Sequence, residues 1–127
     1  MFHYTVSVSG SVEEVAQKLE KSLQEHKFGV LWQLDIPAKL QEKGVMFDQP
    51  YRVLEVCNPH EAKKVLSKNL LVGYFLPCKV VVYDDHGTTK VGMPKPSFLI
   101  STVEDETLRE TAEHVERELI AAIDALS

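Results

Sequence analysis

Alternation of apolar and polar residues in the strand-like segments limits the fold of this chain more than any other feature. The segment FHYTVSV at positions 2–8 places Tyr4 and Val6 on one side and His3 and Thr5 on the other. The segment YRVLEVC at positions 51–57 alternates in the same way. Strands covered on both faces read as continuous apolar runs, whereas a sheet with one covered face alternates. The pattern therefore favours a mainly antiparallel sheet over a doubly wound parallel one.

Two long segments have the periodicity of amphipathic helices, and they supply the cover for one face of such a sheet. The first follows Ser11, which with Glu14 three residues later matches a capping box. The second runs from about Glu104 to Ala125, with Thr102 or Asp105 as its expected cap. We expect an α+β fold in which a curved, mainly antiparallel sheet carries both long helices on one face. At 127 residues the chain has the length of a single domain, 1–127.

The remaining elements are shorter. The sequence predicts a strand over FGVLWQLDI (28–36), a short helix between Pro37 and Gly44, and a helix after Asn58. It also predicts a hairpin that turns at DDHG (84–87). The segment PKPSFLIST (94–102) is expected to be irregular or a last short strand.

Charge and composition exclude several function classes. The 14 Lys and Arg residues against 19 Asp and Glu residues give a net charge of −5. A nucleic-acid binder needs a basic footprint, and anionic membranes attract basic segments, so we expect neither partner. No apolar run approaches the roughly 18 residues of a membrane-spanning helix, and the N-terminus does not resemble a secretion signal. We expect a cytoplasmic protein with reduced thiols.

Local motifs of the common enzyme classes are absent. The chain contains no P-loop, GxGxxG, HExxH, GxSxG or CxxC sequence. The remaining candidates for a reactive or binding site are the two cysteines, which stand in CNPHE (57–61) and LPC (76–78). In CNPHE, Asn58 is a favoured N-cap, Pro59 suits the first helical position, and Glu61 suits the positive end of a helix.

Neither the start of a helix at CNPHE nor the start of a strand at LPC requires a cysteine, so the two cysteines need another explanation. Cys57 precedes a helix N-terminus, which stabilises a thiolate, but burial would raise its pKa instead. Cys78 opens a strand after Pro77 and reads equally well as a buried apolar residue. If the two strands were antiparallel neighbours, the two cysteines would adjoin.

Other candidate site residues stand near these positions. Glu55 lies among apolar groups and is either a cross-strand ion pair or a site residue with a raised pKa. Trp32 is expected to pack in the core or to line a pocket. Two thiolates suit Cu(I) or Zn(II), with His60 and Glu55 as the nearest further ligands.

Three stretches carry a family resemblance: FGVLWQLDIPAKLQEKG, YRVLEVCNPHEAKKVL and GYFLPCKVVVYDDHGTTKVGMPKP. Together they span roughly residues 28–96, and the pairing of CNP with LPC is their most specific part. The chain resembles the family called domain of unknown function 302. The resemblance implies a compact α+β domain with an architecture like that of the TATA-box-binding protein. It implies no activity and gives no reason to expect DNA binding.

Three functions remain open at this point. The first is a small homodimeric binding domain that holds a small ligand or a soft metal near Cys57, Cys78, Glu55 and Trp32. The second is a thiol redox enzyme in which Cys57 reacts and Cys78 resolves. The third is an interaction module without a small-molecule site. The sequence identifies neither a cofactor nor a reaction.

Overall fold

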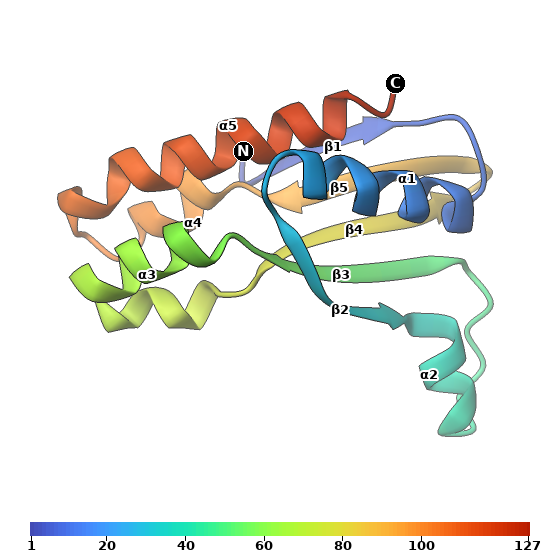
Figure 1. The fold of residues 1–127 in the computed structure, drawn as a ribbon. Helices are drawn as coiled ribbons and strands as arrows, with labels where there is room; N and C mark the ends of the chain where they lie inside the picture. Colours follow the sequence, from blue (N-terminus) through green and yellow to red (C-terminus); the bar gives the residue numbers. More distant parts are fainter.

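The computed structural model describes residues 1–127 as a five-stranded sheet with helices on one face and beyond both ends (Figure 1). The elements follow one another as β1 (His3–Ser7), α1 (Val12–Glu25), β2 (Gly29–Asp35), α2 (Ile36–Glu42), β3 (Tyr51–Cys57), α3 (Pro59–Lys68), the 3₁₀ turn η1 (Leu70–Phe75), β4 (Cys78–Asp85), β5 (Thr88–Pro94), α4 (Pro96–Ser101), the 3₁₀ turn η2 (Glu106–Leu108) and α5 (Arg109–Asp124). The predicted α+β fold is confirmed.

The sheet has the strand order β1-β5-β4-β3-β2, and every neighbouring pair is antiparallel. Its register pairs Leu54 with Val80 and Val56 with Cys78. Paired positions lie on the same face of a sheet. The alternation seen in the sequence therefore separates a covered face from an open face, as expected.

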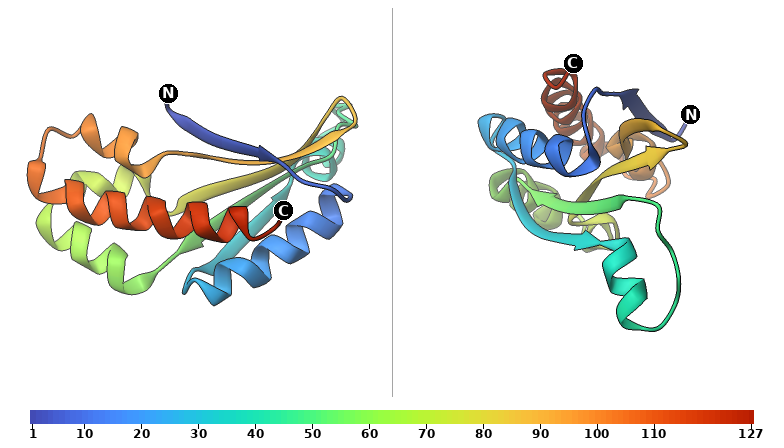
Figure 2. Two further views of the ribbon diagram at one scale, coloured as in Figure 1. Left: turned by 90° about the horizontal axis from the view of Figure 1, so that it is seen from above. Right: turned by 90° about the vertical axis from the view of Figure 1, so that its right-hand side faces the viewer.

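Both long helices cover the same face of the sheet, as the two views of Figure 2 show. The main apolar cluster lies between them and the strands, and its fully buried members include Leu19 and Leu23 of α1, Leu54 of β3 and Leu119 and Ile123 of α5. The capping box at Ser11 and Glu14 is present, so α1 begins where the sequence predicts. No helix is both long enough and apolar enough to cross a bilayer.

A second, smaller apolar cluster lies beyond the end of the sheet where β3 finishes and β4 starts. It is built by α3, η1, α4, η2 and the N-terminal part of α5, which lie side by side at the left of Figure 1. Its buried members are Val65, Val72, Ile100, Leu108 and Ala112. The helix α5 is thus shared, since its first turns join the small cluster and its later turns join the main one.

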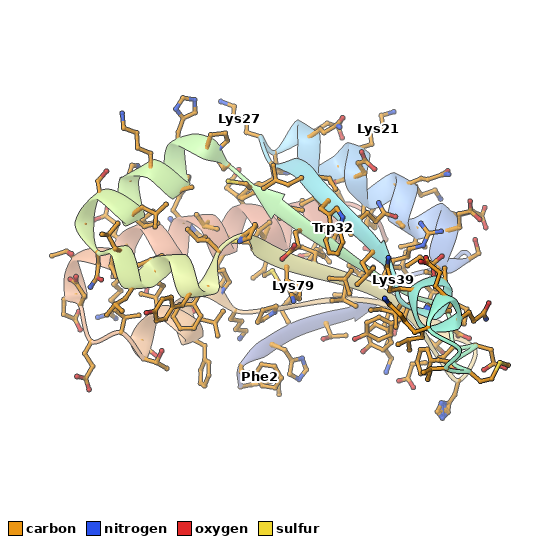
Figure 3. The ribbon with its side chains drawn as sticks, turned by 90° about the horizontal axis from the view of Figure 1, so that it is seen from below. Phe2, Lys21, Lys27, Trp32, Lys39 and Lys79 are labelled. Atoms are coloured by element: carbon orange, nitrogen blue, oxygen red, sulfur yellow. The ribbon has the colours of Figure 1, made fainter.

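Two sequence predictions about this framework are wrong. The segment 94–102 was expected to be irregular or a strand, but it contains the helix α4 after β5 ends. Pro96 stands at its first position, where a proline costs the helix no hydrogen bond. Trp32 was expected to be in the core or in a pocket, but its side chain is 53% exposed on the open face (Figure 3).

The cause of the Trp32 error is a β-bulge in the edge strand β2. The register shifts between Val30, which pairs with Val56, and Trp32, which pairs with Glu55. The extra residue Leu31 reverses the facing of the residues that follow it. Trp32 therefore shares the open face with Glu55 rather than the covered face with Val56.

We expect Leu19→Ala to lower the free energy of unfolding by about 2–5 kcal/mol, because Leu19 is fully buried between α1 and the sheet. Lys21→Ala is the matched control on the exposed side of the same helix and should change stability by less than about 0.5 kcal/mol. Urea unfolding of both variants measures the difference. Equal unfolding midpoints would show that packing of α1 against the sheet does not stabilise the fold.

Candidate functional site

An apolar pocket with a volume of about 300 Å³ separates the two clusters. Its lining combines residues of the main cluster, such as Val56 and Leu119, with residues of the small cluster, such as Val65, Ile100 and Ala112. Of its 23 lining residues, 15 are hydrophobic, so its walls favour an apolar occupant. The pocket is therefore the feature of the fold that most needs a function.

The strand ends bring both cysteines to this pocket. Because β3 and β4 are antiparallel neighbours, the last residue of β3, Cys57, stands next to the first residue of β4, Cys78. Both line the pocket, and both are free thiols. The condition under which the sequence predicted that the two cysteines adjoin, antiparallel pairing of their strands, is therefore met.

The register also separates the two side chains. Cys78 pairs with Val56 and shares its covered face, whereas alternation along β3 turns Cys57 to the other side of the strand. Side chains whose Cβ vectors diverge do not form a disulfide without movement of the backbone. The arrangement is thus one of neighbouring thiols, each on its own side of the sheet edge.

Burial governs the chemistry of Cys78. It raises the pKa of the Cys78 thiol to about 11, and the nearby Cys57 contributes in the same direction. A thiol with such a pKa is protonated at neutral pH and is therefore a weak nucleophile and a weak metal ligand.

The helix after Cys57 begins as the sequence predicts. The side chain of Asn58 accepts hydrogen bonds from the backbone N–H groups of His60 and Glu61 at 3.1 and 3.3 Å, and Pro59 opens α3. This turn fixes Glu61 on the side of α3 that faces the pocket, four residues before the buried Val65.

Glu61 is the one ionisable side chain in the structure with a buried, unpartnered oxygen. Its Oε1 accepts from the Lys64 ammonium at 3.4 Å, while its Oε2 is buried and has no hydrogen-bond partner. Buried polar groups in folded proteins are paired with few exceptions. This oxygen is shielded from solvent, although its residue lines the pocket.

The other residues singled out from the sequence are divided between the pocket and the surface. Glu55 lines the pocket and lies opposite Lys79 on β4, although the two side chains form no ion pair. Trp32 points from the open face of the sheet and does not line the pocket (Figure 3). His60 is exposed on α3 and lies outside the pocket as well.

The predicted soft-metal ligands do not assemble into a coordination sphere. No group of three or more His, Cys, Asp or Glu side chains lies close enough together to hold a metal ion. A structural zinc site needs four such ligands.

Sequence reasoning did not find the helical walls of the pocket, which come from α3, η1, α4 and α5. One signal was available in the residue pattern. Glu61 precedes Val65 by four residues and so interrupts the apolar stripe of its helix with a carboxylate. That position was interpreted as a helix-start residue alone.

Comparison with known proteins gives a family and no activity. A search of curated protein sequences found no match. A solved crystal structure of an uncharacterized conserved DUF302 protein from Bacillus stearothermophilus is 54% identical in sequence and superimposes with a TM-score of 0.96. The match covers 100% of this chain and 99% of that one.

The family model described as domain of unknown function DUF302 matches residues 4–126. The resemblance first noted in the stretches around the two cysteines therefore extends over nearly the whole chain. The chain belongs to the DUF302 family.

Proposed function

We propose that this domain binds a small, largely apolar molecule in the pocket between the two apolar clusters. The observation that carries the proposal is the pocket itself, about 300 Å³ in volume with mainly hydrophobic walls. Ligand pockets of about 300–1,000 Å³ with apolar walls and a few polar groups are typical of small-molecule sites. An apolar cavity of about 150 Å³ is already large enough to bind benzene.

The polar groups of the pocket are few, and all but Thr111 of α5 stand at or near its sheet end. Cys57, Cys78 and Glu55 come from strand ends, and Glu61 comes from the first turn of α3. Groups placed in this way can orient a ligand whose apolar part is buried farther in. A small organic ligand fits this distribution better than a soft metal, since the acidic and histidine side chains do not converge on the cysteines.

Thiol redox chemistry is the second hypothesis, and the geometry supports it less well. A resolving cysteine must attack as a thiolate, but burial keeps the Cys78 thiol protonated. The two side chains also leave the sheet edge on different faces. We therefore interpret the cysteines as parts of the pocket wall.

Pairing of two copies and a cytoplasmic location stay predictions from the sequence. The exposed apolar side chains Leu31 and Trp32 on the edge strand β2 are one surface to which a second copy could bind.

We expect n-octanol, as a neutral apolar probe, to bind in this pocket and to shift the NMR signals of Val65, Ile100 and Leu119. Ala62→Phe should weaken octanol binding at least about tenfold, because Ala62 lines the pocket and a phenyl ring there occupies its volume. Ala121→Phe, at an exposed position on α5, is the matched control.

Two outcomes would argue against the binding proposal. One is equal octanol affinity in the Ala62→Phe and Ala121→Phe variants. The other is a set of shifted signals scattered over the surface instead of gathered at the pocket.

Because the Cys78 thiol is buried in the pocket wall, we expect the free energy of unfolding to fall at alkaline pH. Its pKa is raised in the folded chain from 9.0 to about 11, so the fold favours the protonated thiol. The resulting stabilisation is complete below about pH 9 and is lost as the pH rises to about 11, with a size of about 2–3 kcal/mol. Urea unfolding at both ends of this range should show a smaller alkaline loss for Cys78→Val than for the wild type. Identical losses would mean that Cys78 ionises freely in the folded protein.

A further inference from the structure

We propose that a second copy of this chain docks on the open face of the sheet and on the arm beside it, which is formed by α2 and the connector that follows (residues 36–50). The two copies are related by a two-fold axis, so each presents the same surface to the other. Docking of a second copy does not depend on whether the pocket holds a ligand.

The open face of the sheet has an apolar centre although no helix covers it. Alternation places Val53 of β3 and Val81 of β4 on this face, and the two residues are direct cross-strand partners. The next pair on the same face, Tyr51 and Tyr83, stacks with ring centroids 5.3 Å apart. Trp32 of the edge strand adds a large exposed side chain. A face of an antiparallel sheet that stays in water is normally polar, so the apolar centre indicates a face that a partner covers.

The arm exposes apolar side chains next to this face. The helix α2 is seven residues long, and none of its residues is buried. Helices shorter than about 12 residues are marginal in water unless they pack against a partner. The connector then exposes three consecutive apolar residues, Val45, Met46 and Phe47. In Figure 1 the arm stands apart from the other helices, and in Figure 2 (left) and Figure 3 it lies on the side of the sheet away from α1.

Both ends of the arm are fixed to the sheet. Asp35 accepts a hydrogen bond from the backbone N–H of Ala38 at 3.1 Å, and its carboxylate lies 3.6 Å from the Arg52 guanidinium. At the other end, the Gln49 side chain donates to the backbone oxygen of Asp84. A surface that is ordered before association loses less conformational entropy when it binds.

The charges of the open face favour a second copy as the occupant. The chain has a net charge of −5, so most ways of pairing two copies bring like charges together. On the open face, however, the acidic residues Glu55 and Asp85 are balanced by Lys79 and Lys90. Asp85 and Lys90 pair within the chain at 2.7 Å, whereas Glu55 and Lys79 form no ion pair. A two-fold arrangement lets Glu55 of each copy pair with Lys79 of the other.

The edges of the sheet are less suited to pairing than its face. The edge strand β2 is interrupted by the bulge at Leu31, and the opposite edge strand β1 has only five residues. Bulges and short edge strands are common devices against edge-to-edge pairing. The face of a five-stranded sheet with strands of this length spans roughly 20 Å in both directions. With the arm added, this surface approaches the roughly 800 Å² per partner of a standard interface.

Analytical ultracentrifugation over a range of protein concentrations tests the proposal. The wild type should reach twice the 14.3 kDa mass of one chain. Glu55→Lys and Lys79→Glu should each weaken the dimer at least about tenfold, because each brings like charges together twice across the two-fold axis. An equimolar mixture of these two variants should associate at least about tenfold more tightly than either alone, because each substituted side chain then faces an opposite charge. Lys21→Glu on the helix side is the matched control and should change the affinity less than about twofold (Figure 3).

Three outcomes would overturn the proposal. A wild type that stays at 14.3 kDa at every concentration would leave the face to a different partner. A dimer that both charge variants leave intact would lie on another surface, and so would one whose variants associate no better in the mixture than alone. Trp32→Glu, on the same face, should also dissociate the dimer, and it decides the matter if a charge variant does not fold. The mass is measured without any ligand, so its result is independent of the octanol titration.

Discussion

The structure depends on the way α5 packs against two different partners. Its later turns, with Leu119 and Ile123, lie on the sheet and complete the main cluster with α1. Its first turns, with Ala112, pack against α3, η1 and α4 beyond the end of the sheet. The two clusters share this helix but do not close on each other, and the pocket lies where α5 passes from one to the other. The pocket is thus a consequence of the two separate sets of partners that α5 packs against.

The elements that the sequence predicted well are those governed by local physics. Alternation determined the two faces of the sheet, and the caps at Ser11 and Asn58 located two helix starts. The sequence left open whether Cys57 and Cys78 are neighbours, and the antiparallel pairing of β3 with β4 brings them together. The errors have non-local causes. A bulge at Leu31 turned Trp32 outward, and only the folded arrangement shows that Pro96 opens a helix that closes the pocket.

The pocket itself was beyond prediction from one sequence, because its walls combine residues of β3, α3, η1, β4, β5, α4 and α5, which only the folded arrangement brings together. The sequence did locate its sheet end, since Cys57, Cys78 and Glu55 all line it. What changed is the chemical interpretation of these residues. Burial makes the Cys78 thiol resemble an apolar wall residue more than a reactive group, while Glu61, first explained as a helix-start residue, has a buried oxygen without a hydrogen-bond partner.

An accessible apolar cavity separates the two clusters in the native protein. Crystallography under xenon pressure tests it most directly, because xenon enters dry apolar cavities without needing a polar partner. We predict that xenon binds between Val65, Ile100 and Leu119 and that none binds inside the close-packed main cluster. Absence of xenon, together with direct contact between the side chains of the two clusters, would contradict it.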